Sequence, residues 1–217
     1  MRVYHFTTQA GGMAILRSRR IRLSRLKTLN DPFELLAVEA SDKLTRSFLR
    51  SNRDEVHETT GFVCFSKGWQ NPVQWGNYAD RHRGLCLGFD VSDQHLSEVH
   101  YQPERVPAKE FRAIAAAQDV ESLRRIGTTK YDHWSYENEV RSIYKLTGAD
   151  ADGYEYVAFN TDLKLREVLV GANNITLSRR ELFGAINGLG HINIKKVRPS
   201  FKDFKMVEQK LPKLGLR

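Results

Sequence analysis

The sequence predicts an α+β protein that folds as a single domain. A chain of 217 residues suits one domain better than two. Its 41% hydrophobic and 28% charged residues are typical of a globular protein and exclude a fibrous or wholly disordered one. Segments with a strand pattern outnumber helical ones, and their connections are short. No internal repeat or low-complexity linker divides the chain, so we expect one domain over residues 1–217.

The first elements follow from local patterns. Val3–Thr7 is rich in aromatic and β-branched residues, which predicts a strand. Thr8 can cap a helix that ends near Arg19. Ile21–Ser24 alternates apolar and polar residues, as a half-buried strand does. Thr28–Glu34 contains Asn-Asp-Pro and predicts a turn.

The middle of the chain alternates helices and buried strands. We expect a polar helix over Leu35–Glu58 and a buried strand over Gly61–Ser66. Asn71–Arg83 predicts a helix, with Pro72 at an early position where its missing N–H costs little. Gly84–Asp90 predicts a second buried strand.

The second half supplies the remaining elements. Val99–Gln102 predicts an edge strand, and the Ala-rich segment Ala108–Ile126 predicts one helix. The later elements are strands over Glu137–Leu146, Tyr154–Asn160 and Leu165–Gly171, a helix over Ser178–Leu189, and two strands within Ile194–Val207.

The positive charge is concentrated in two segments. The chain has 34 basic and 26 acidic residues, a net charge of +8. Arg17–Lys27 holds six basic residues and no acid, and Lys195–Arg217 holds eight against two acids. Without both segments the rest of the chain is about −4. The segments predict either a solvated surface or contact with a phosphate-bearing partner.

Composition also excludes several classes. Cys64 and Cys86 do not form a CxxC pair, which argues against a disulfide framework or a structural zinc site. The sequence shows no apolar run that would suit a secretion signal or a membrane span. We therefore expect a cytoplasmic protein without a metal.

The first group of candidate site residues lies on the first predicted strand, in Tyr4-His5-Phe6-Thr7. Side chains alternate along a strand, so His5 and Thr7 share a face. A histidine beside a hydroxyl can bind a sugar hydroxyl or an amide. The alternative is a structural histidine within the fold.

The second group follows the strand Gly61–Ser66 and contains Ser66, Trp69, Trp75 and Tyr78. Trp75 and Tyr78 are three residues apart and would share a helix face. Aromatic faces stack on planar rings such as nicotinamide or a nucleobase. The alternative is that all three aromatic residues belong to the core.

The third group is His133–Arg141, with sequence HWSYENEVR. On a strand Glu137, Glu139 and Arg141 would project from one face. Two carboxylates held by an arginine can stabilise a developing positive charge. The alternative is a salt-bridge ladder on a surface strand.

These motifs carry a resemblance to known families. YHFT, LNDPFE, FSK, WGNYAD, RGLCLGFD and HWSYENEVR resemble a bacterial family of unknown function, DUF2971. Their order is similar to that of the ADP-ribosyltransferase superfamily, which has His-x-Ser/Thr on the first strand and a Glu on a later one. The resemblance implies a split or mixed β-sheet core of that type with flanking helices, and NAD+ as substrate.

The resemblance also implies residue roles. Glu139 would stabilise the charge that develops on the ribose, His5 would hold the ribose and Tyr78 would stack on the nicotinamide. Cys64 or Phe65 stands where many members have a stacking tyrosine, so Trp69 and Trp75 are alternatives to Tyr78. The other implied cofactor-binding residues are Tyr4, Thr7, Ser66, Trp69, Trp75, Glu137 and Arg141.

Three functions remain open at this point. The first is an NAD+-dependent ADP-ribosyltransferase acting on a nucleic-acid or protein acceptor, or hydrolysing NAD+, with a toxin or phage-defence role. The second is a non-catalytic nucleotide- or nucleic-acid-binding module. The third is a metal-dependent nuclease, whose ligands would be Asp31, Glu34, Asp80 and His82. The residues do not predict an oligomeric state.

Overall fold

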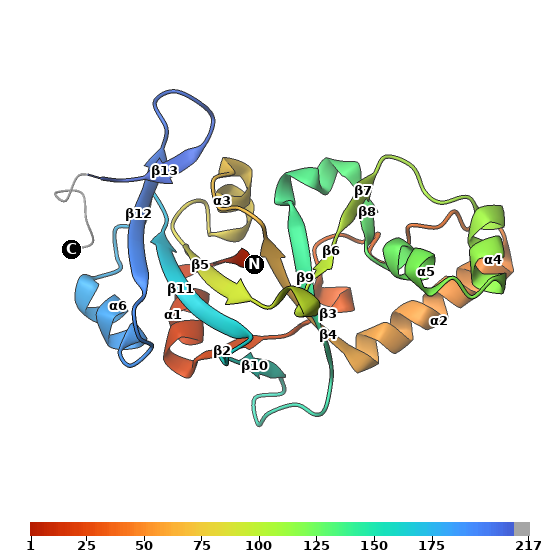
Figure 1. Ribbon diagram of the computed structural model, residues 1–217, viewed down its shortest axis with the longest axis horizontal. Coiled ribbons are helices and arrows are strands. Elements are labelled where there is room, and N and C mark those ends of the chain that lie inside the picture. Colours follow the sequence, from red (N-terminus) through yellow and green to blue (C-terminus); the bar gives the residue numbers. More distant parts are fainter. Residues whose placement is uncertain (211–217) are drawn as a thin grey trace. The chain divides into compact units, whose positions relative to one another are not determined.

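The computed structural model describes residues 1–210 and confirms the α+β class (Figure 1). Contacts along the chain divide it into two compact units. Unit 1 comprises residues 1–22, 64–95 and those from 156 onward, and unit 2 comprises 23–63 and 96–155. The sequence pattern gave no sign of this division, because none of the four boundaries carries a linker composition.

Unit 1 is built on a mixed sheet. Strand β5 pairs antiparallel with both β1 and β11, whereas β11 and β12 run parallel. The far strand β13 is antiparallel to β12, and the end of β4 pairs with β1. The strands are β1 (Arg2–Thr7), β4 (Thr60–Ser66), β5 (Leu85–Val91), β11 (Leu163–Val170), β12 (Asn193–Pro199) and β13 (Met206–Glu208), with a separate pair β2 (Arg20–Arg22) and β10 (Tyr156–Ala158).

Helices cover both faces of this sheet. Helix α3 (Pro72–Tyr78) packs Trp75 against Phe6, and the surrounding core includes Cys86 and Leu169. On the opposite face α1 (Gln9–Ser18) lies so close that a Cβ on Gly12 would meet the Leu85 side chain at 2.7 Å. Helix α6 (Arg179–Ile186) packs beside α1, and a short 3-10 turn, η2 (Asp93–His95), follows β5.

Unit 2 combines short strands with three helices. The beginning of β4 pairs with β3, β9 pairs antiparallel with β6, and β7 runs parallel to β8. Val38, Leu49 and Phe111 form a core that joins α2 and α4. The elements are β3 (Ser24–Arg25), η1 (Leu26–Thr28), α2 (Lys43–Thr59), β6 (Ser97–Glu98), β7 (His100–Gln102), α4 (Ala108–Ala116), α5 (Val120–Gly127), β8 (Thr129–Tyr131), η3 (Asp132–Glu137) and β9 (Glu139–Lys145).

Two predicted helices are shorter than expected. The helix expected from Leu35 begins at Lys43, because the Asp42 carboxylate caps it through the Thr45 N–H and Leu35 has a left-handed φ of 58°. The helix expected over Asn71–Arg83 ends at Tyr78. A run of three left-handed residues, Asp80 to His82, ends it, and apolar periodicity cannot reveal such a turn.

Two further predictions fail at local breaks. The single helix expected over Ala108–Ile126 is two helices, separated at Gln118 (φ 53°), and Asp119 caps the second. The strand expected from Glu137 begins at Glu139. Glu137 ends the 3-10 helix η3, and Asn138 turns the chain with a φ of 44°. Short polar residues tolerate this conformation, which redirects the chain within one residue.

Part of the basic C-terminal segment has structural partners. Lys196 on β12 donates its ammonium protons to the carbonyls of Gly171 and Asn174, both at 2.6 Å. Burial lowers the pKa of Lys196. Lys213 and Arg217, which belong to the same predicted segment, lie outside the described residues. The segment is therefore not purely a solvated surface.

Candidate functional site

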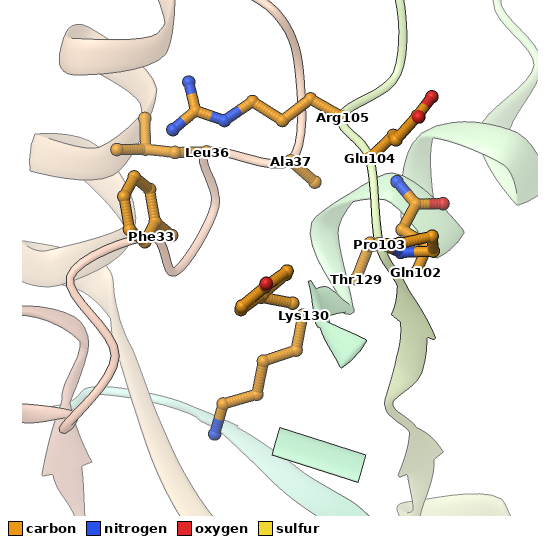
Figure 2. A pocket seen from close by; sticks show the side chains of 10 residues that line it. Phe33, Leu36, Ala37, Gln102, Pro103, Glu104, Arg105, Thr129 and Lys130 are labelled. Carbon is orange, nitrogen blue, oxygen red and sulfur yellow. The ribbon is translucent and has the colours of Figure 1, made fainter. Parts of the chain in front are cut away.

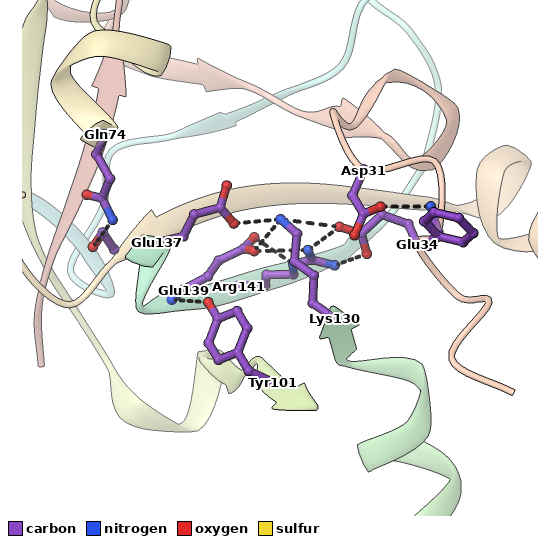
Figure 3. Close-up of polar contacts among 10 residues, drawn as sticks. Asp31, Glu34, Gln74, Tyr101, Lys130, Glu137, Glu139 and Arg141 are labelled. Carbon is purple, nitrogen blue, oxygen red and sulfur yellow. Dashed lines mark hydrogen bonds and ion pairs between the residues drawn. The ribbon is translucent and has the colours of Figure 1, made fainter. Parts of the chain in front are cut away.

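A group of charged side chains is buried within unit 2 (Figure 3). We call it the carboxylate cluster, and each member is 7% exposed or less. Charged side chains are almost never this buried unless they are paired. The members are Glu34, Lys130, Glu137, Glu139 and Arg141.

Four segments of the chain position the cluster. Glu34 lies in the predicted Asn-Asp-Pro-Phe-Glu turn, and Lys130 is the central residue of β8. Glu137 ends η3. Glu139 and Arg141 are two apart on β9, so their side chains leave the strand on the same face. The predicted grouping of Glu137, Glu139 and Arg141 is thus present, although Glu137 joins it from outside the strand.

Arg141 binds two carboxylates at once. Its Nη1 donates to Glu34 Oε2 at 2.8 Å and its Nη2 donates to Glu34 Oε1. Its Nε donates to Glu139 Oε1 at 2.7 Å, and Nη2 also reaches Glu139 Oε2 at 3.1 Å. Such forked contacts fix both the position and the orientation of a carboxylate. Arg141 therefore holds Glu139 in one rotamer.

Lys130 binds the same carboxylates from another side. Its ammonium lies 2.6 Å from Glu137 and 3.3 Å from Glu139, and 3.8 Å from Glu34. Burial by itself would lower the pKa of Lys130, but the three carboxylates outweigh it and raise that pKa above its usual value. The ammonium also lies 4.8 Å from the centre of the Trp134 ring. Lys130 therefore stays charged at neutral pH.

The cluster has one more carboxylate than it has cations, since three acids face two bases. Electrostatic interactions are stronger in a buried site than in water. Tyr101 adds a neutral group, because its hydroxyl accepts the Glu139 N–H at 2.8 Å and burial raises its pKa to about 12. A carboxylate held in one orientation in such a site is suited to stabilising a positive charge.

His5 and Thr7 lie in unit 1 on one face of β1, as predicted. The His5 Nδ1 is 3.1 Å from the Cys64 carbonyl, which can only accept, so Nδ1 carries the proton. In the neutral ring Nε2 is then the acceptor. The ring meets Phe65 edge-on at 6.1 Å, and burial lowers the pKa of His5.

The aromatic candidates lie on the other face of this sheet. Tyr78 ends α3, which packs on the Phe6 face, opposite to His5. Trp75 has no exposed surface, and its Nε1–H donates to the Trp69 carbonyl at 2.6 Å. Trp69 packs against the same core. Trp75 thus has the core role that was the alternative to stacking.

The remaining unit 1 candidates have protein partners. The Ser66 hydroxyl accepts from the Gln74 amide at 3.1 Å and from the Gly68 N–H at 3.3 Å. The Tyr4 hydroxyl lies 3.5 Å from Glu167. Burial, with Glu167 second, raises the pKa of Tyr4 to about 12. Both residues are neutral groups at physiological pH.

The nuclease ligands proposed from the sequence do not form one group. Asp31 and Glu34 belong to unit 2, whereas Asp80 and His82 belong to unit 1. Glu34 is bound by Arg141, and Asp80 pairs with Arg83 at 2.8 Å. Within residues 1–210 no three or more His, Cys, Asp or Glu side chains are grouped to hold a metal ion.

The His5 pKa leads to a pH prediction. Its folded pKa is below the ordinary value of 6.5, so the unfolded chain takes up the proton first as pH falls. The contribution of His5 to stability is present above pH 6.5 and is lost below it. We expect the urea midpoint to fall between about pH 7.5 and 5.5, and to fall less in His5→Gln. An equal fall in both proteins would contradict this.

The sequence patterns did not predict that Lys130 and Glu34 belong to the carboxylate cluster. Lys130 was not singled out, because a lysine in a short strand resembles a surface residue. Glu34 was considered only as a metal ligand. Arg141 lies 107 residues from Glu34 in sequence, so only the folded chain reveals their pairing.

Comparison with known proteins gives one finding. Residues 74–142 match the family described as protein of unknown function (DUF2971). This confirms the family resemblance predicted from the motifs over that range, which includes Lys130, Glu137, Glu139 and Arg141. No curated protein and no solved structure matches the chain. Among residues 1–210, no helix has the length and apolar character needed to cross a membrane.

Proposed function

We propose that the protein is an NAD+-dependent ADP-ribosyltransferase. The observation that carries the proposal is the Glu139 carboxylate, which is buried and held in place by Arg141 and Lys130. The motif order of the sequence, with His5-x-Thr7 first and Glu137-x-Glu139 later, supports the same chemistry.

The reaction requires a stabilised positive charge. The bond between nicotinamide and C1′ of the ribose breaks, and nicotinamide leaves with the bonding electron pair. The ribose then carries positive charge until the acceptor attacks C1′ and loses its proton. Glu139 stabilises this charge and accepts a hydrogen bond from the ribose 2′-OH. Because Arg141 already fixes the carboxylate, little reorganisation is needed during the reaction.

The proposal gives His5 and Thr7 a binding role. The Nδ1–H of His5 donates to the Cys64 carbonyl, so His5 presents Nε2 as an acceptor for a ribose hydroxyl. Thr7 supports His5 or the nicotinamide amide from the same face of β1. Tyr78 ends a helix on the opposite face of the sheet from His5, so its stacking on the same nicotinamide does not follow from this arrangement. The orienting roles of Ser66 and Arg141 stay predictions.

The test is release of nicotinamide from labelled NAD+ by the full-length protein. We expect Glu139→Gln to slow release about 10²–10³-fold, because the amide keeps the shape and loses the charge. The matched control is Asp90→Asn, which neutralises an arginine-paired acid outside the cluster. We expect the control to keep most of the activity. Equal losses in both variants, at equal stability, would contradict a direct role for Glu139.

The wider setting is part of the same proposal. The acceptor is a nucleic acid or a protein, and the protein works in the bacterial cytoplasm as a toxin or phage-defence effector. The motif resemblance supports this setting. Labelled ADP-ribose found on neither class of acceptor, with nicotinamide still released, would reduce the activity to NAD+ hydrolysis.

A second candidate is a non-catalytic nucleotide- or nucleic-acid-binding module. The ion pairs of Glu139 favour it, because both carboxylate oxygens serve Arg141 and Lys130. This candidate predicts that the protein binds nucleotide without releasing nicotinamide, and that Glu139→Gln leaves binding unchanged. Measuring binding and turnover on the same samples separates the two functions.

A further inference from the structure

A basic hollow lies beside helix α2 in unit 2. It encloses about 480 Å³, and its apolar lining comes from Leu36, Val38, Ala40 and Leu49. Five of its lining residues are cationic and one is acidic. The charged lining residues are Lys27, Arg46, Arg50, Arg53, Arg105 and Asp54.

Helical spacing concentrates this charge. Arg46, Arg50 and Arg53 are four and three residues apart on α2, so they share one face. Like charges at this spacing repel each other and weaken a helix. Repulsion among these arginines therefore destabilises α2, and a bound anion would reduce that repulsion.

One acid, Asp54, faces the five cations of the hollow, and its pKa is lowered first by Lys27 and also by the charges of Arg50 and Arg53. Asp54 pairs with Lys27 at 2.8 Å, and Arg46 donates to the Ala40 carbonyl at 3.1 Å. Arg50 and Arg53 make no hydrogen bond or ion pair with any residue in 1–210. The Nε of Arg53 is buried and has no partner there either. A buried donor without a partner is costly, and an anion supplied from outside would satisfy it.

An aromatic hollow adjoins the basic one. Leu36 and Arg105 line both, and the second hollow encloses about 270 Å³ (Figure 2). Phe33 is half exposed in it, and the Arg105 guanidinium lies 4.9 Å from the centre of the Phe33 ring. Tyr131, Pro103 and Gln102 add further apolar surface and one amide. The volume is close to the lower end for small-molecule pockets, about 300 Å³.

We propose that these two hollows bind single-stranded nucleic acid, with phosphates in the basic hollow and a base against Phe33. A nucleic-acid strand carries a planar base beside each phosphate. The two adjoining hollows offer a matching pair of surfaces, cations for the phosphates and an aromatic face for the base. Base pairing and stacking keep the bases of a duplex from entering such a pocket. The site lies wholly within unit 2, and binding there does not depend on the ADP-ribosyltransferase proposal.

The phosphate part is tested by anisotropy of a fluorescein-labelled oligothymidylate with the full-length protein. We expect the double variant Arg50→Gln/Arg53→Gln to bind at least about tenfold more weakly. Its plot of log affinity against log salt should be shallower by about 1.4, since each phosphate contact on a single strand contributes about 0.7. The matched control is Lys43→Gln/Lys109→Gln, which removes the same charge from positions outside the hollow. Equal weakening by both double variants would overturn the site.

The base part is tested with other probes. Phe33→Ala should weaken oligothymidylate binding about tenfold and leave inorganic polyphosphate binding unchanged. Duplex DNA of the same sequence should bind more weakly than the single strand. Binding of duplex DNA or polyphosphate as tight as that of the single strand would overturn the base pocket. Binding to phosphatidylserine vesicles without any binding to the oligonucleotide would overturn the whole proposal. Thermal melts that match wild type confirm that the variants fold.

Discussion

Replacing Arg141 with leucine should lower the free energy of unfolding by about 3–5 kcal/mol, because two buried carboxylates lose their partner. Arg141 is 3% exposed and holds both Glu34 and Glu139. Leucine fills part of the space but leaves negative charge in a region of low polarity. Urea unfolding followed by circular dichroism measures the change.

A matched control is Arg166→Leu. Arg166 also pairs with an acid, Asp90, at 2.8 Å, but both side chains are about 40% exposed. Exposed pairs contribute about 0–1 kcal/mol, so the control should unfold near the wild-type midpoint. If Arg141→Leu also changed stability by less than about 1 kcal/mol, the cluster would not be a coupled buried network.

A second variant distinguishes lost pairing from lost packing. In Arg141→Leu/Glu34→Gln, one of the two carboxylates that lose their arginine is replaced by a neutral amide. We expect the double variant to be more stable than Arg141→Leu alone, because removing an unpaired buried charge is favourable. Additive destabilisation would instead indicate that the arginine acts through packing.

Replacing Trp75 with alanine should cost about 3–5 kcal/mol, as expected for removing a large core side chain. Trp75 is fully buried, and it meets Phe6 edge-on at 5.3 Å between ring centres. Alanine would leave a cavity among Ala79, Cys86 and Leu169. Chemical denaturation of the variant and wild type measures the loss.

Trp75→Phe is the control for this prediction. Phenylalanine keeps an aromatic ring against Phe6 and loses the hydrogen bond to the Trp69 carbonyl. The partly buried carbonyl left without its donor should cost about 1–3 kcal/mol, less than the cavity. Loss of ligand binding in Trp75→Ala without any loss of stability would show that the ring binds ligand after all.

Local chemistry explains which elements the sequence could predict. Thr8, Asn71 and Ser178 cap the helices that follow them, as their short polar side chains do in isolated segments too. The buried strands β4 and β5 match their apolar runs. The predictions failed at Gln118 and Asn138, where one left-handed residue redirects the chain and leaves no mark in the apolar pattern.

The sequence by itself therefore determined the α+β class, the starts of α1, α3 and α6, and the Glu-x-Glu segment, because capping and strand alternation act over a few residues. The tertiary structure alone decided that Lys130 and Glu34 meet Glu139 and Arg141, and that Lys27 and Arg105 line a hollow with the arginines of α2. The residues of the carboxylate cluster come from distant segments and meet because each buried charge requires a partner. The cations of the hollow are brought together by the apolar packing of the segments around α2.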